Sequence, residues 1–113
     1  MKIIIVTLKL DELKQMAEAT FGNLVKAVVD IEREVVAVDA ELHSDLEALL
    51  LENGSKQKNL WGINLYPEIQ GDDFVEFDSM INMRPSQGNR SRGIESEGIR
   101  KNIVIIVAKR IKK

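Results

Sequence analysis

The sequence predicts an α+β domain: a mainly antiparallel sheet of about five strands with helices packed on one face. Three observations lead to this prediction. Runs of β-branched residues alternate with stretches of helical periodicity, turn-forming residues separate these elements, and no stretch is long enough to link two domains. At 113 residues the chain has the size of one domain, so we expect residues 1–113 to share one core. The expected order of elements is β-α-β-β-α-β-β-α.

The first half of the chain predicts a strand, a helix and a hairpin. Residues 2–7 form a β-branched run that is typical of a buried strand. Asp11 is the expected N-cap of a helix, and Gly22 is its expected stop. Residues 24–31 and 35–42 are two β-rich runs joined by three charged residues, which predicts a β-hairpin.

The second half begins with a helix and continues with two strands. Ser44 and Glu47 have the spacing of a capping box, in which each side chain binds the other residue's backbone amide. The helix they predict should end at the pair Asn53-Gly54, because these residues adopt the left-handed conformation most readily. Residues 60–66 and 74–83 then predict two further strands.

The last segment, residues 99–111, carries two conflicting signals. Its β-branched run at 103–107 favours a strand by propensity. Isoleucines at near-helical spacing, with Ser96 as N-cap, favour a helix instead. We predict a helix here.

Polar residues alternate with apolar ones along the strand predicted at 74–83. Successive side chains of a strand point to opposite faces of a sheet, so the polar set should lie on the face that the helices leave open. The same alternation occurs in the two strands before it. We therefore expect one shared polar face, although an ordinary solvated sheet face has the same pattern. Its expected members are Asp39, Glu41, Asn64, Asp78, Asn82 and Arg84.

Composition excludes several classes of protein. The chain has no cysteine, which rules out disulfides, thiolate zinc sites and cysteine nucleophiles. No apolar run reaches the roughly 18 residues that cross a bilayer, so we expect a cytoplasmic protein without a membrane partner. The net charge of -2 hides an asymmetry, since residues 84–113 carry nine Lys or Arg and only two acids. This asymmetry favours a nucleic acid or another acidic partner, but the basic end could equally neutralise the acidic body.

An arginine- and glycine-rich segment, residues 84–93, follows the last predicted strand. Arginine grips oxyanions with two parallel hydrogen bonds, and glycine lets backbone amides approach them closely. The segment therefore predicts an anion-binding loop for phosphate or carboxylate, although it could also be a solvated turn that pairs with the acidic sheet face. The candidate ligand-binding residues, including three from the polar face, are Arg84, Gln87, Asn89, Arg90, Arg92, Asn82, Asp78 and Asn64.

His43 is the only histidine, and its side chain is the one whose ordinary pKa lies near neutrality. A nearby carboxylate, Glu41, could raise the pKa of His43 and orient its ring for proton transfer. These two residues are the candidate catalytic residues, with packing as the ordinary alternative for a lone histidine. One histidine with a few carboxylates is a weak metal site, so we expect no metal and no cofactor.

Four segments of the chain together resemble a known family. They are ELHSD at 41–45, LWGIN at 60–64, EFDSMIN at 76–82 and NRSRG at 89–93. They are similar to the hallmark segments of a family of short prokaryotic proteins known only as a domain of unknown function. The resemblance covers essentially the whole chain and implies a single small prokaryotic domain. It implies no activity, cofactor or catalytic residue.

Three functions stay open at the level of the sequence. The first, which we favour, is a binding module that holds a phosphate-bearing ligand, a nucleic acid or a nucleotide, through the Arg/Gly loop. The second is a small metal-independent phosphodiester hydrolase that uses His43 and Glu41. The third is a homo-oligomeric interaction protein whose open sheet face pairs with a second copy of itself.

Overall fold

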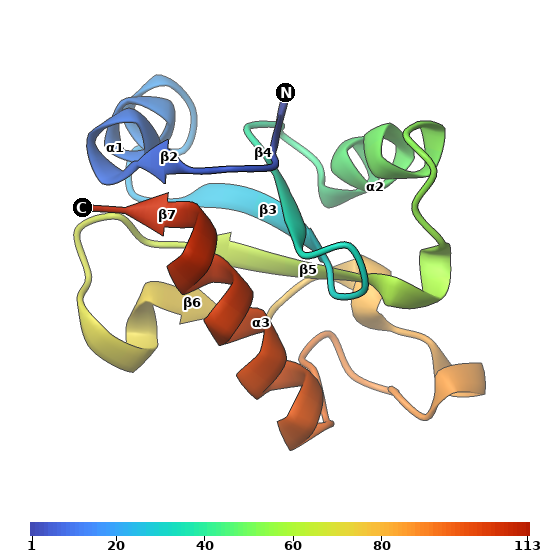
Figure 1. The fold of residues 1–113 in the computed structure, drawn as a ribbon. Coiled ribbons are helices and arrows are strands. Elements are labelled where there is room, and N and C mark those ends of the chain that lie inside the picture. Colours follow the sequence, from blue (N-terminus) through green and yellow to red (C-terminus); the bar gives the residue numbers. More distant parts are fainter.

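A five-stranded antiparallel sheet lies at the centre of the fold in the computed structural model, which describes residues 1–113 (Figure 1). Its strand order is β1-β4-β3-β5-β6. The three inner strands are β3 (Val25–Asp30), β4 (Val35–Val38) and β5 (Leu60–Leu65), and the edge strands are β1 (Lys2–Ile4) and β6 (Val75–Glu76). Every pairing within the sheet is antiparallel. The predicted α+β class and the five-stranded antiparallel sheet are therefore confirmed.

Three helices pack on this sheet: α1 (Leu10–Ala19), α2 (His43–Glu52) and α3 (Glu97–Arg110). None of them is long and apolar enough to cross a membrane. A second, parallel sheet of only two short strands joins β2 (Leu8–Lys9) to β7 (Ile111–Lys112). The sequence did not predict this small sheet, which ties the end of α3 to the start of α1.

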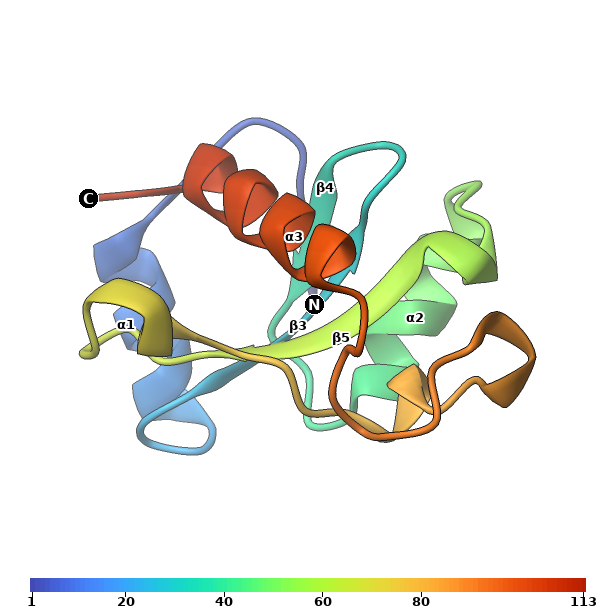
Figure 2. The same cartoon turned by 90° about the horizontal axis from the view of Figure 1, so that it is seen from below.

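The core has one part on each face of the sheet. The larger part lies under α1 and α3 and includes Val29, Trp61 and Ile63. The smaller part lies under α2, where Leu46 and other helix residues meet the opposite side chains of the strands. Figures 1 and 2 both show α2 and α3 on opposite sides of β5. In this detail the structure differs from the prediction of helices on one face only, because near α2 the strands are apolar on both faces and both faces need a cover.

The strand predicted at 74–83 is only two residues long, Val75–Glu76. Beyond it, a side chain makes the hydrogen bonds to β5 that the rest of the strand was expected to make. Beyond Glu76 the chain leaves β5 and forms a 3-10 turn at Met80–Asn82. The Asn82 side chain then accepts a hydrogen bond from the Gly62 amide at 2.8 Å and donates one to the Gly62 carbonyl at 2.9 Å. These are the bonds that a neighbouring strand would make. Gly62 is required here, because an added Cβ would lie 2.5 Å from the Cβ of Ser79.

Two of the predicted helix starts are wrong, and the third is confirmed. Helix α1 begins at Leu10 with Lys9 as N-cap, and the Asp11 side chain lies in its first turn. Helix α2 begins at His43, and the Ser44–Glu47 capping box does not form, since the Glu47 carboxylate turns to Arg84 instead. The Ser96 side chain caps α3 by accepting a hydrogen bond from the Ile99 amide, as predicted. The choice of helix over strand for the last segment is confirmed with it.

The predicted helix stop at Asn53-Gly54 is also confirmed. Gly54 follows the end of α2 with a φ of +96°, a left-handed conformation that is strained for residues with a Cβ. The amide of Ser55 then donates to the carbonyl of Leu50 at 3.0 Å, which closes the last turn of the helix.

Candidate functional site

Asn89 organises the arginine-rich loop from the inside. Its Nδ2 donates hydrogen bonds to the carbonyl oxygens of Asn82, Ser91 and Gly93, at 2.6, 3.1 and 2.8 Å. Its Oδ1 accepts the amide of Glu95 at 2.8 Å. The side chain is buried and its donors and its acceptor are all in use. Asn89 therefore holds the loop in shape and has no free group for a ligand.

Arg84 closes the free edge of β5 and does not reach into solvent. The residue is only 9% exposed, and its Nε donates to the Ile81 carbonyl at 3.0 Å. Its terminal nitrogens donate to the carbonyls of Gln57, at 2.9 Å, and Leu60. One of them also lies 3.6 Å from a carboxylate oxygen of Glu47. Burial lowers the pKa of Arg84 and Glu47 opposes that change, so Arg84 acts as part of the fold.

The other loop residues lie at the surface. The Gln87 side chain donates to the Lys58 carbonyl at 3.2 Å, and Arg90 is exposed with only its backbone amide bonded, to Glu95. The Nε of Arg92 donates to Asp78 at 2.8 Å, and its side chain is 55% exposed. The loop therefore separates its three arginines into one that is buried, one that is free and one that is paired.

Only Arg92 of these three lines a cavity, which we call the His43 pocket. It has a volume of about 500 Å³ and lies on the sheet face that α2 covers in part, beside the first residues of α2. Its lining is polar towards the sheet and apolar at the side: Phe21, Leu24, Lys26, Leu42, His43, Ser44, Asn64, Tyr66, Glu76, Asp78, Ser79, Met80, Ile81 and Arg92.

The His43 ring is held in one orientation by β5. The residue is 9% exposed, and its Nε2 donates to the Ile63 carbonyl oxygen at 2.7 Å. Because a carbonyl only accepts, Nε2 carries the proton and the neutral ring keeps Nδ1 as an acceptor. Burial is the largest influence and lowers the pKa of His43; the hydrogen bond to Ile63 opposes it, Lys26 lowers the pKa again, and Asp78 and Asn64 raise it by less. The ring is therefore neutral at neutral pH.

Asn64 brings an unpaired acceptor to the same pocket. Its Nδ2 donates to Glu76 at 2.8 Å and to the Asp78 carbonyl at 3.3 Å. Its Oδ1 is buried without any hydrogen-bond partner, in a residue that is 7% exposed. An unpaired buried acceptor costs about 1–3 kcal/mol, and a donor group placed in the pocket would recover that energy.

The remaining charges of the pocket are two cations and two carboxylates. Lys26 forms no ion pair, and its Nζ lies 5.1 Å from the centre of the Phe21 ring. Glu76 accepts hydrogen bonds from Asn64 and from the Tyr66 hydroxyl, the latter at 3.0 Å. Burial raises the pKa of Tyr66, and the bond to Glu76 raises it further. Tyr66 therefore stays protonated at neutral pH and remains a donor.

The structure brings together only part of the predicted site. The pocket contains His43, Asn64, Asp78 and Arg92. It does not contain the remaining predicted residues, which are Glu41, Asn82, Arg84, Gln87, Asn89 and Arg90. Glu41 is exposed, and it follows Asp39, whose φ of +74° takes the chain out of the strand before Glu41 could share the expected polar face.

Sequence reasoning missed five polar residues of the pocket: Lys26, Ser44, Tyr66, Glu76 and Ser79. Lys26 carried a usable signal, because it alternates with apolar neighbours in β3 and therefore belongs to the same face as Asn64, with which it pairs in register. No group of three or more His, Asp or Glu side chains in the chain is arranged to hold a metal ion.

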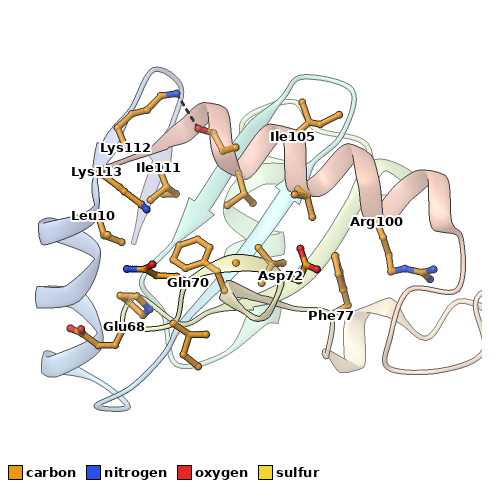
Figure 3. Close-up of a pocket in the computed structure, with 18 of the residues that line it drawn as sticks. Leu10, Glu68, Gln70, Asp72, Phe77, Arg100, Ile105, Ile111, Lys112 and Lys113 are labelled. Carbon is orange, nitrogen blue, oxygen red and sulfur yellow. Dashed lines mark hydrogen bonds between the residues drawn. The ribbon is translucent and has the colours of Figure 1, made fainter.

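A larger groove lies on the other side of the molecule, between α3, α1 and residues 67–74 (Figure 3). It contains none of the predicted site residues and shares no residue with the His43 pocket. The two hollows are therefore separate from each other.

Comparison with known proteins gives one match. A family model described as "Protein of unknown function (DUF5674)" matches residues 2–110. No curated protein and no solved structure matches the chain. The matched residues include the whole sheet, all three helices and every residue of the His43 pocket.

Proposed function

The chain belongs to the DUF5674 family of proteins of unknown function, and we propose that it is a binding module for a small phosphate-bearing ligand of the nucleotide class. The ligand binds in the His43 pocket. One observation carries this proposal: the pocket places a buried, unpaired acceptor, Asn64 Oδ1, among cations whose donors are not fully used.

The two cations are suited to a phosphate group. Lys26 has no carboxylate partner, and Arg92 uses only its Nε, towards Asp78. The terminal nitrogens of Arg92 therefore remain able to form the paired hydrogen bonds with which arginine binds phosphate. Lys26 adds a point charge from β3, on the same face of the sheet.

The acceptors select a second feature of the ligand. Asn64 Oδ1 and His43 Nδ1 both accept hydrogen bonds, so they require N–H or O–H donors. A ligand that carries an anion at one end and such donors at the other fits this arrangement, as a nucleotide does with its phosphate, its sugar hydroxyls and its base. Inorganic phosphate is smaller than a nucleotide and has no sugar or base donors to place beside Asn64 while it binds the cations.

The size of the pocket favours a small molecule over a nucleic-acid strand. Its volume of about 500 Å³ falls within the range of roughly 300–1,000 Å³ that is common for small-molecule sites. Of the loop arginines only Arg92 lines it, whereas a nucleic-acid strand would need several phosphate contacts in a row.

The test is a titration of the chain with nucleoside monophosphates and, separately, with inorganic phosphate, followed by calorimetry. We expect Arg92→Ala and Lys26→Ala each to weaken nucleotide binding at least about tenfold, equal to roughly 1.4 kcal/mol. Arg90→Ala is the matched control, because Arg90 is an exposed arginine of the same loop outside the pocket. Equal losses in Arg90→Ala and Arg92→Ala would point to the general charge of the loop and would contradict a pocket ligand.

A second candidate function is hydrolysis of a phosphodiester, which the state of His43 favours. The neutral ring donates from Nε2 to the Ile63 carbonyl, so Nδ1 is free to take a proton from an attacking hydroxyl. Lys26 and Arg92 would stabilise the developing negative charge. Glu41 has no part in this version, and Asp78 is the carboxylate that acts on the ring.

Turnover of bis(p-nitrophenyl) phosphate separates the two functions. His43→Gln keeps an N–H donor for the Ile63 carbonyl but removes the basic nitrogen. If the chain is a hydrolase, this variant should lose turnover by far more than it loses nucleotide affinity, because the glutamine amide oxygen can still accept the hydrogen bond that Nδ1 accepts. Turnover that survives in His43→Gln would exclude His43 as the base.

A further inference from the structure

The groove between α3, α1 and residues 67–74, which we call the α3 groove, has a volume of about 1190 Å³ and is larger than the His43 pocket. Figure 3 shows it as a trough with Arg100 towards one end and Lys112 and Lys113 towards the other. The apolar part of its lining includes Leu10, Phe74, Val75, Phe77, Val104 and Ile105.

Several of these apolar side chains are open to solvent. Ile105 is 65% exposed and Val104 is 48% exposed, both on the outer side of α3, and Ile69 on the opposite wall is 42% exposed. Single exposed apolar residues are ordinary, but several along one groove indicate a surface that binds another molecule.

Open strand edges border the same groove. Strand β7 pairs only with β2, and β6 is the last strand of the main sheet, so each has a neighbour on one side only. Ile111 and Lys112 of β7 and Val75 of β6 belong to the lining. The free edge of a strand presents unpaired N–H and C=O groups, and an extended peptide binds to such an edge by adding a strand.

The charges of the groove are nearly balanced. Its lining holds five Lys or Arg and four Asp or Glu, including the ion pairs Lys14–Glu68 and Lys101–Glu97. The alternative occupant of an apolar groove is a lipid-like molecule with an anionic head group. Such a molecule would need a cluster of positive charge in the lining, which this lining does not have. Recognition through backbone groups and apolar side chains fits it better.

The length of the groove agrees with a short peptide. The ten residue steps from Arg100 to the end of α3 at Arg110 correspond to about 15 Å along the helix axis, the length of roughly four or five residues of extended chain.

We infer that the α3 groove binds a short extended peptide segment of a partner protein, which adds as a strand to β7 and places alternate apolar side chains against Ile105, Val104 and Phe74. This site is independent of the ligand proposed for the His43 pocket, because the two hollows share no residue.

The experiment selects phage-displayed random hexapeptides on the full chain, with counter-selection on the Ile105→Glu variant. The strongest peptide is then synthesised with a fluorescent label, and its binding is measured by polarisation. We expect Ile105→Glu to weaken binding at least tenfold and Ile5→Glu to change it less than twofold. Ile5 is a matched control, since it is 63% exposed and lies outside the groove. We also expect slower amide exchange at Lys112 when the peptide is bound.

A second peptide, N-methylated at alternate backbone amides, tests the strand itself. Methylation removes the backbone donors and keeps the side chains, so it should weaken binding at least tenfold if the peptide pairs with β7. Equal affinity of the methylated peptide, or no enrichment of any peptide over the Ile105→Glu variant, overturns the inference. Sedimentation could instead show that the chain associates with itself. If Ile105→Glu abolishes this association and the peptide does not disrupt it, the groove is a contact between two copies of the chain and not a peptide site.

Discussion

Two regions beside β5 use the same residue types, asparagine and arginine, in opposite ways. At one end, Asn82 and Arg84 bind the free edge of β5, and every polar group of the Asn82 amide has a partner. At the other end, Asn64 leaves its Oδ1 unpaired in the His43 pocket, and Arg92 uses one nitrogen and stays 55% exposed.

The difference shows how to separate structural polar residues from candidates for ligand binding. What distinguishes Asn82 from Asn64 is how many of the hydrogen-bonding groups of each are already used by the fold. A residue whose groups are all used stabilises the fold, whereas an unused buried group costs free energy until something binds it. Variants at the two ends should therefore affect different measurements: unfolding at the β5 edge, and ligand binding in the pocket.

The largest expected effect is that of Arg84→Ala. This change removes three hydrogen bonds to backbone carbonyls and leaves the largely buried Glu47 carboxylate without its cation. Removing one partner of a buried pair costs about 3–5 kcal/mol of unfolding free energy. Urea unfolding measures it, with Arg92→Ala as the control, for which we expect a change below about 1 kcal/mol. Similar losses in the two variants would show that the arginines do not divide into structural and ligand-binding residues.

The asparagine pair gives the next largest contrast. Asn82→Ala leaves the Gly62 amide and two carbonyls without partners, and we expect a loss of about 3 kcal/mol in unfolding free energy. Asn64→Ala removes an unpaired acceptor together with two donor contacts, so its net cost should be below about 1 kcal/mol. If Asn64→Ala is as destabilising as Asn82→Ala in urea, Asn64 is a structural residue and the pocket loses its main selecting group.

Gly62→Ala tests how closely the loop approaches β5. The new Cβ would lie 2.5 Å from the Cβ of Ser79 and 2.6 Å from its Oγ, so the loop must shift outward. We expect a loss of about 1–3 kcal/mol, the usual range for overpacking a well-packed site. The alternative result, no change in stability, would mean that the loop moves away from β5 freely and that the Asn82 bonds are not tight. Gly98→Ala is a suitable control, because its Cβ would meet nothing closer than 3.8 Å.

The sequence predicted the fold through signals that are local. The period of two in the strands, the Ser96 cap and the stop at Gly54 each depend on neighbours within a few residues. The capping box at Ser44 failed because a distant residue, Arg84, binds the Glu47 carboxylate. Local pattern contains no information on such a competitor.

The candidate site was predicted only in part for the same reason. The alternation in residues 76–84 placed Asp78 and Asn82 in one polar set, but it could not distinguish an asparagine that binds the backbone of β5, such as Asn82, from one that lines a pocket, such as Asn64. One signal could have helped. A glycine within a strand often marks the close approach of another segment, and Gly62 in β5 is where the Asn82 side chain docks.

The smallest expected effect is the pH dependence that His43 contributes. Burial lowers the pKa of His43 below the ordinary value of 6.5, which we take for the unfolded chain. The unfolded chain therefore binds the proton first as the pH falls, and the folded state loses stability below about pH 6.5 until His43 itself is protonated. Above that pH its contribution is fully present. For one proton the slope cannot exceed about 1.4 kcal/mol per pH unit.

Unfolding free energies of the unmodified chain and of His43→Gln, measured from pH 7.5 to 5.5, should diverge only in the lower half of this range. Parallel curves throughout would mean that the ring titrates normally, and the pocket would then hold a cation at mildly acidic pH rather than a free acceptor.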